Sequence, residues 1–114
     1  MPKNTRLSRD EMTAFFKGRS SRIRGEFVDL AHAPAPTLKI ACVVSKKSLP
    51  RAVDRNRVRR RIKAALSRAA FQTTTPLVLV FTVRAPAATT TFKALALEVV
   101  QLAEKAVLSY NGRI

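Results

Sequence analysis

The sequence predicts an α+β fold in which a single-layer mixed sheet packs with helices, in the order helix, strand, strand, helix, strand, helix. Apolar residues recur with a helical period through residues 52–71, which favours an amphipathic helix. A nearly continuous apolar run at 77–83 is typical of a strand that is covered on both faces. Because 114 residues are the usual size of one compact domain, we expect residues 1–114 to form a single domain.

The first half of the chain is expected to form a short helix and a hairpin. The helix begins after Ser8, which is a plausible cap, and ends near Gly18. Residues 23–31 alternate loosely between apolar and charged side chains, as a strand does. The segment 33–36 (APAP) then breaks the chain into a loop, and 38–45 (LKIACVVS) is expected to pair back as the second strand.

The helix predicted at 52–71 has an apolar face and a cationic face. With Val58 at 0° and an advance of roughly 100° per residue, one sector contains the apolar side chains, which are Ile62, Ala65, Leu66 and Ala69. The rest of the helix surface contains Asn56, Arg57, Arg59, Arg60, Lys63 and Arg68. Arg55 falls near the apolar sector by angle, but from the first turn it can project past the edge of the core.

The last third of the chain is expected to contain the central strand and a long helix. Residues 73–76 (TTTP) end the preceding helix, and 77–83 form the strand. A threonine among 89–91 can cap the final helix, which ends by Gly112. Its apolar face is marked by Phe92, Leu95, Val99, Leu102 and Ala106.

The charge of the chain indicates a polyanionic partner. Lys and Arg number 22 against 7 Asp and Glu, which gives a net charge of +15, and residues 39–68 alone hold eleven basic side chains and one acidic one. Such a concentrated block predicts one face that meets nucleic acid. An anionic membrane is set aside, because no apolar run approaches about 18 residues and no Trp is present to anchor an interfacial helix.

The cysteine content and the start of the chain favour a cytoplasmic protein. Cys42 is the only cysteine, so neither an internal disulfide nor a thiolate metal site can form within one chain, which fits a reducing compartment. The first residues lack the apolar segment of a signal peptide, and Asp10 and Glu11 argue against an acid-poor transit peptide.

Residues suited to protein-based RNA cleavage are scarce. Such an active site normally needs paired carboxylates that hold metal ions, or a histidine that acts as acid or base. His32 is alone beside the Pro-rich loop and is expected to be solvated. Glu98 and Glu104 are expected to face solvent, and Asp54 suits the positive end of a helix dipole. We therefore expect no catalytic residue and no metal bound by the protein alone.

The strongest functional signal is the basic block at 55–63, where six of nine residues are basic and most are arginine. The arginine fork binds phosphate oxygens bidentately and stacks on bases. A solvated helix face usually alternates in sign, yet only Asp54 offsets eight basic residues between positions 51 and 68. Asn56 can add directional hydrogen bonds to a base edge or sugar, or it can simply start the helix, and both interpretations stay open. An RNA-binding face is predicted.

Two segments resemble the hallmark of the bacterial ribonuclease P protein family: 44–47 (VSKK) and, after a short spacer, 52–60 (AVDRNRVRR). The resemblance extends through essentially the whole chain. It implies the ribonuclease P protein-like fold (ribosomal protein S5 domain 2-like), with a left-handed crossover through the basic helix between parallel strands. It implies an accessory subunit of a ribonucleoprotein hydrolase, the endonuclease that removes the 5′ leader of precursor tRNA. Catalysis would then be carried by the RNA subunit and its Mg²⁺ ions.

The resemblance also implies two sets of site residues. The residues expected to contact the catalytic RNA are Lys46, Lys47, Arg51, Arg55, Asn56, Arg57, Arg59, Arg60 and Lys63. Those expected to line or edge a cleft for the single-stranded leader of precursor tRNA are Phe16, Val43, Ser45 and Arg84. Phe16 has a second interpretation as a core residue. Met12 and Leu30 stand where relatives often have aromatic residues. This implies fewer aromatic rings on which leader bases can stack, and leader binding that depends more on electrostatic attraction.

Two other function classes are compatible with the residues. A ribosomal or other structural RNA-binding protein would explain the charge and the size without any link to cleavage. A protein nuclease would instead cut RNA by itself and lose activity when His32 is changed.

Overall fold

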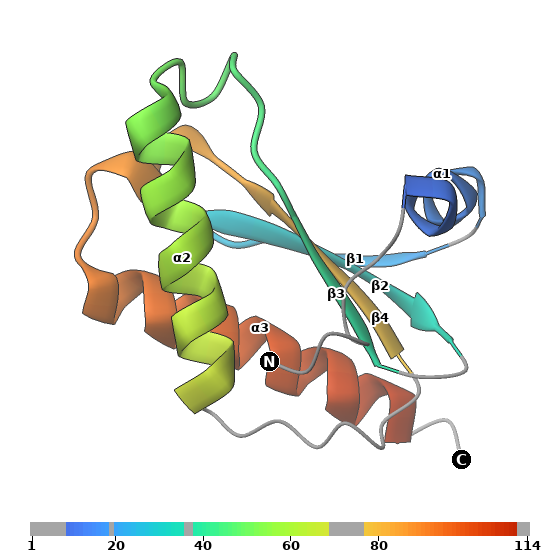
Figure 1. The fold of residues 1–114 in the computed structure, drawn as a ribbon. Coiled ribbons are helices and arrows are strands. Elements are labelled where there is room, and N and C mark those ends of the chain that lie inside the picture. The colour runs from blue at the N-terminus through green and yellow to red at the C-terminus, as the bar shows by residue number, and fades with distance from the viewer. Residues whose placement is uncertain (1–8, 19, 36–37, 69–76, 112–114) are drawn as a thin grey trace.

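The computed structural model describes residues 9–18, 20–35, 38–68 and 77–111, whose strands form one mixed sheet with helices on both faces (Figure 1). The elements are α1 (Arg9–Lys17), β1 (Ser21–Ile23), β2 (Val28–Pro34), β3 (Lys39–Val43), α2 (Ala52–Arg68), β4 (Leu77–Val83), the short 3₁₀ helix η2 (Ala85–Ala88) and α3 (Phe92–Asn111). The strand order in the sheet is β1-β2-β4-β3. β3 and β4 pair in parallel, whereas β2 pairs antiparallel with both β1 and β4. The predicted α+β class with a mixed sheet is confirmed.

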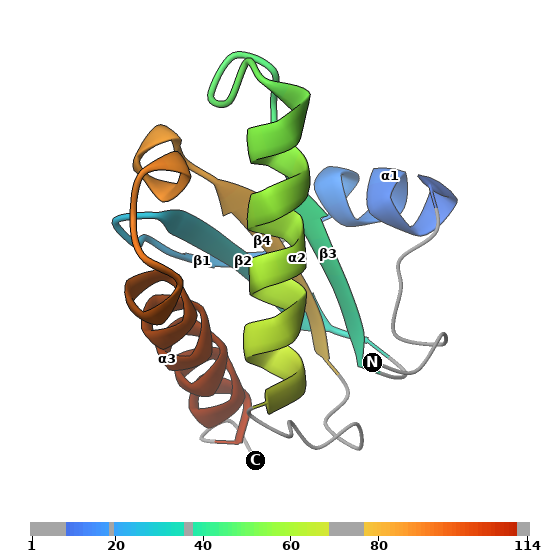
Figure 2. The same ribbon diagram turned by 60° about the vertical axis from the view of Figure 1, so that its left-hand side comes forward.

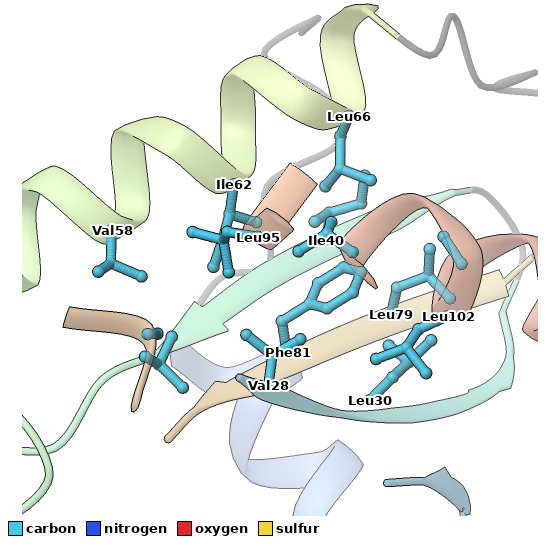
Figure 3. Close-up of a cluster of buried hydrophobic side chains, with 14 of the residues drawn as sticks. Val28, Leu30, Ile40, Val58, Ile62, Leu66, Leu79, Phe81, Leu95 and Leu102 are labelled. Carbon is cyan, nitrogen blue, oxygen red and sulfur yellow. The ribbon is translucent and has the colours of Figure 1, made fainter. Parts of the chain in front are cut away.

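The larger core lies between the sheet and the pair of helices α2 and α3, which share one face of it (Figures 1 and 2). Phe81 of β4 is fully buried at its centre, and Ile62 and Leu95 reach it from the two helices (Figure 3). The opposite face carries a smaller cluster in which Val80 meets side chains of α1, including Phe15. Because both faces are covered, β4 is buried except at Thr82, which confirms the prediction of a central strand.

The number and pairing of the early strands differ from the expectation. The segment 23–31 is not one strand, since it contains the end of β1, a turn at 24–27 and the start of β2, and β2 continues to Pro34. The expected hairpin between 23–31 and 38–45 is also wrong, because β3 pairs with β4. The alternation of apolar and polar side chains shows which face of a strand is buried, but it does not show which strand lies beside it. Three strands therefore precede α2 instead of two.

A carboxylate from α3 holds the turn that separates β1 from β2. The Glu98 side chain accepts backbone hydrogen bonds from the N–H groups of Glu26 at 2.6 Å, Phe27 at 2.7 Å and Val28 at 2.9 Å. A Cβ atom on Gly25 would overlap the Val28 carbonyl oxygen and lie 2.8 Å from the Glu98 carboxyl carbon, so this position requires glycine. The prediction that Glu98 faces solvent is wrong, because its carboxylate is hydrogen-bonded to this turn. The residues that it binds lie about 70 positions away in sequence, so a pattern of neighbouring residues could not predict the contact.

The α-helices agree with the predicted ones wherever the structure describes them, whereas η2 forms in a segment that was predicted to be a connector. α2 buries the predicted stripe, which comprises Val58, Ile62, Ala65 and Leu66. The Ala94 N–H donates to the Thr91 hydroxyl at 3.1 Å, so a threonine of the predicted group does cap α3. Ser8, Ala69, residues 73–76 and Gly112 lie outside the described residues. α2 joins the parallel strands β3 and β4, as the resemblance implied, and the left-handed sense of that connection stays a prediction.

Candidate nucleic-acid interface

The buried stripe of α2 leaves its cationic residues on the outside of the molecule. Asn56, Arg57, Arg60 and Lys63 are exposed and Arg59 is half-buried; we call these five residues the α2 surface. Lys46, Lys47 and Arg51 are exposed on the segment that leads into the helix, residues 44–51, which we call the lysine loop. All nine predicted RNA-contact residues thus lie on one helix and the loop that precedes it, and eight of them belong to the α2 surface or to the exposed part of the lysine loop.

The ninth residue, Arg55, braces the lysine loop from within. Its Nη1 atom donates hydrogen bonds to the carbonyl oxygens of Leu49 and Pro50, each at 2.8 Å. At the other end of the loop, the Ser45 hydroxyl accepts the Ser48 N–H at 3.1 Å and donates to the Ser48 hydroxyl, also at 3.1 Å. These bonds give the loop a defined shape before any ligand arrives. Contact between Arg55 and RNA stays a prediction beside this structural role.

The basic side chains of α2 spread to both of its flanks. Burial raises the pKa of the Cys42 thiol on β3 to about 11, against the opposing effect of the positive charges of Lys63 and Arg59. Those two residues therefore lie on the flank of α2 that faces β3. On the other flank, Arg61 donates from Nη1 to the Thr90 carbonyl oxygen at 3.2 Å, just before α3. Positive charge thus extends across the full exposed width of the helix.

Phe16, from the predicted leader cleft, lies on the surface and not in the core. It is 52% exposed and makes an edge-to-face contact with Phe15, with ring centroids 5.5 Å apart. Phe15, together with Met12, packs against the sheet. Leu30, in contrast, is fully buried in the core below α2 and α3, on the face of the sheet that α1 does not cover. An aromatic at that position would not reach a ligand beside Phe16, so this departure does not weaken the leader surface.

The other predicted leader residues lie on or beside the sheet face that α1 covers. Val43 is half-buried there and stands opposite Thr82 in the register of β3 and β4, and Thr82 stands opposite Asp29 of β2. Ser45 follows β3 and belongs to the lysine loop. Arg84 follows β4, where its Nη1 atom donates to the Gly25 carbonyl oxygen at 2.9 Å and lies 3.8 Å from the Asp29 carboxylate.

Sequence reasoning did not select Thr82 or Asp29 as members of this row. Thr82 had a usable signal, since it is the one polar residue inside the apolar run 77–83 and the one exposed position of β4. Asp29 had none, because its position depends on the turn that Glu98 holds. We call Val43, Thr82 and Asp29 the sheet-face row.

The acidic and histidine residues do not gather. Within the ranges that the structure describes, no group of three or more His, Cys, Asp or Glu side chains could hold a metal ion. His32 is 6% exposed in β2, so the prediction of a solvated loop histidine is wrong; the strand extends further than the prolines suggested. Across the same ranges, no helix is long and apolar enough to cross a membrane.

Solved structures of ribonuclease P proteins have the same architecture. A mutant of the Staphylococcus aureus RNase P protein, described as defective in mRNA degradation activity, matches with a TM-score of 0.78 at 16% identity, covering 91% of this chain and 89% of that one. The RNase P protein from Thermotoga maritima matches with a TM-score of 0.73 at 17% identity, covering 85% and 93%. No curated protein matches the chain.

At such low identity the solved structures show the fold, and the sequence itself shows the family. The family model described as ribonuclease P matches residues 1–107. The basic block and the lysine loop, which carried the resemblance, both lie inside that match. The chain therefore belongs to the ribonuclease P protein family, the protein part of a tRNA-processing ribonuclease.

Proposed function

We propose that this chain binds the catalytic RNA of ribonuclease P through the α2 surface and the lysine loop, and holds the 5′ leader of precursor tRNA on the sheet face that α1 covers. One observation carries the proposal: α2 buries its apolar stripe and leaves Arg57, Arg60 and Lys63 exposed, with a single acid, Asp54, in its first turn. A folded chain of this charge needs a polyanion, and family membership supports an RNA of this ribonuclease.

A rigid helix is well suited to such docking. Its 17 residues span about 25 Å at 1.5 Å per residue, which is long enough to follow several successive phosphates. Arg57 and Arg60 provide bidentate donors, and the neutral Asn56 provides directional hydrogen bonds. Because Arg55 fixes the lysine loop beside the helix, Lys46 and Lys47 extend the same positive surface.

The leader proposal rests on a different part of the molecule. Phe16 presents an exposed ring on α1, and base stacking on such rings is tolerant of sequence. The sheet-face row supplies a small hydroxyl at Thr82 and an apolar side chain at Val43. Arg84 adds positive charge that Asp29 partly offsets. This arrangement suits an unpaired strand of variable sequence.

In this proposal the RNA subunit, and not the protein, carries out the cleavage reaction. Mg²⁺ takes oxygen ligands and is commonly held by carboxylates and phosphates, whereas the α2 surface consists of cations and one amide. We therefore assign Mg²⁺ mainly to the RNA subunit and expect the isolated polypeptide not to cleave RNA. The proposed setting is the cytoplasm.

Reconstitution tests this function directly. Adding the polypeptide to a catalytic RNA subunit at low Mg²⁺ should stimulate cleavage of precursor tRNA at the mature 5′ end. Absence of stimulation would refute the proposal, and cleavage by the polypeptide alone would favour a protein nuclease.

A double variant tests the α2 surface. Arg57→Ala with Arg60→Ala should weaken binding to the catalytic RNA and reduce the slope of log affinity against log salt by about one to two units, since each lost phosphate contact removes about 0.7–0.9. The matched control is Arg24→Ala with Lys105→Ala, which removes the same charge from exposed positions outside α2. An equal loss in both double variants would mean that net charge, not this surface, binds the RNA.

A further inference from the structure

A groove between α2 and α3 remains unexplained by the functions proposed above. It has a volume of about 570 Å³ and is lined by Ala65, Arg68, Phe92, Lys93, Ala96, Leu97 and Val100. The lining thus combines an apolar floor, one aromatic ring and two cations, and it includes no acidic side chain. Leu97 is 59% exposed at this site, so its apolar side chain is open to contact with a ligand.

The two cations of the groove are arranged differently. The guanidinium carbon of Arg68 lies 5.2 Å from the centre of the Phe92 ring, in cation–π contact. Arg68 is itself exposed, so the Phe92 contact leaves part of its planar guanidinium open to a ligand. Lys93, one residue further along α3, supplies an exposed point charge.

These features specify the chemistry of an occupant. It must offer a flat apolar or aromatic face to the floor and the guanidinium plane, and a negative charge to Lys93. A nucleotide combines a flat base and a negatively charged phosphate in one ligand, and bases stack on both aromatic rings and arginine. The groove volume lies within the roughly 300–1,000 Å³ of sites that take small organic ligands. The net charge of +15 favours an anionic occupant over a second copy of this chain.

The position of the groove indicates which RNA supplies that nucleotide, the catalytic RNA or the leader of precursor tRNA. The groove lies along α2, whose exposed residues form the proposed docking surface, and both α2 and α3 cover the same face of the sheet (Figure 2). The proposed leader surface lies on the opposite face, with α1 (Figure 1). An RNA strand that crosses α2 can reach the groove, whereas a leader held beside α1 is separated from it by the sheet.

We infer that the α2–α3 groove takes an unpaired nucleotide of the catalytic RNA, with its base against Arg68, Phe92 and the apolar floor, and its phosphate on Lys93. The inference rests on the proposed function and names a second contact for the same RNA.

A matched pair of variants on one helix tests the inference. Leu97→Asp places a carboxylate at the groove, while Leu108→Asp makes the same change at a position 69% exposed and outside the lining. Both alter net charge equally and neither empties the core. In filter binding to the catalytic RNA, Leu97→Asp should weaken affinity by roughly ten-fold or more, and Leu108→Asp by no more than about two-fold, because loss of one stacked base alone costs about five-fold or more. Equal affinities would overturn the inference.

Two further measurements separate the remaining outcomes. Phe92→Leu keeps an apolar side chain but removes the ring, and it should weaken binding roughly five-fold while leaving the salt slope unchanged. Ultraviolet crosslinking of 4-thiouridine-substituted catalytic RNA should label the segment Phe92–Val100, and Leu97→Asp should abolish that label. Crosslinks from a substituted leader instead, or binding of an acidic apolar peptide at the groove with no RNA label, would overturn the inference.

The inference and the proposed function fail in different ways. If Arg57→Ala with Arg60→Ala weakens RNA binding while the groove variants do not, the function stands and the inference falls. If the polypeptide fails to stimulate the catalytic RNA at all, the proposed function falls first.

Discussion

The carboxylate of Glu98 should be one of the most important single side chains for the stability of this fold. It accepts three backbone hydrogen bonds from the turn between β1 and β2, at 2.6 to 2.9 Å, and two of these bonds are partly buried. Hydrogen bonds to charged groups contribute about 1.5–3 kcal/mol each. The bond from the Glu26 N–H is exposed, and water can replace it when the side chain is removed.

We therefore expect Glu98→Ala to lower the free energy of unfolding by about 3 kcal/mol, which is near the lower limit for the two partly buried bonds. At roughly 4 °C per kcal/mol for a domain of this size, the melting temperature should fall by about 12 °C. Glu98→Gln keeps the shape but turns one acceptor into an NH₂ group that faces a donor, so a loss of about 2 kcal/mol is expected.

The assay is urea unfolding followed by far-ultraviolet circular dichroism, with amide hydrogen exchange as a local readout. Exchange at Glu26, Phe27 and Val28 should accelerate more than exchange in β4, because the turn opens before the sheet does. Glu104→Ala is the control, since Glu104 is an exposed glutamate of the same helix and should change stability by less than about 0.5 kcal/mol. Equal losses for the two glutamates would refute the role assigned to Glu98.

Three other predictions concern single residues. Gly25→Ala should destabilise the protein by about 2 kcal/mol or more in the same urea assay, because the added Cβ would overlap the Val28 carbonyl oxygen; wild-type stability would show that the turn can shift freely. Phe16→Leu should weaken binding of precursor tRNA roughly five-fold while sparing mature tRNA and the melting temperature, and a loss shared by mature tRNA would argue against leader stacking. Cys42 should react with iodoacetamide at pH 8 about a hundred-fold more slowly in the folded than in the unfolded chain, because its pKa is raised from 9.0 to about 11. Since the folded state keeps a proton that the unfolded state loses, the free energy of unfolding should also fall as pH rises from about 9 to about 11, and Cys42→Ala should lack that part of the fall.

Much of the candidate interface could be predicted from local pattern. The apolar stripe of α2 recurs at helical spacing, so the sequence alone showed that Val58 and Ile62 face inward and that Arg57 and Arg60 face outward. The central strand could also be predicted from the sequence, because a strand covered on both faces is apolar at nearly every position. The Thr91 cap follows from the chemistry of a single side chain at a helix start.

The errors share one physical cause, which is that each depends on contacts between residues distant in sequence. β3 pairs with β4, although the whole of α2 lies between them in the sequence. The pattern of apolar and polar residues in 38–45 does not show which strand is the partner. The turn at 24–27 is held by Glu98 from α3, so both the extra strand and the hydrogen-bonded, half-buried glutamate were missed together. His32 was judged from neighbouring prolines, whereas the pairing of β2 with β4 buries it.

The sequence by itself determined that this protein has an amphipathic basic helix, a buried central strand and a charge suited to RNA, because periodicity and charge are properties of neighbouring residues. Only the tertiary structure decided which strands pair, which arginines are used internally, and that Arg68 and Phe92 meet across two helices to form one side of a groove. Those features depend on packing, which brings together side chains that the chain order keeps apart.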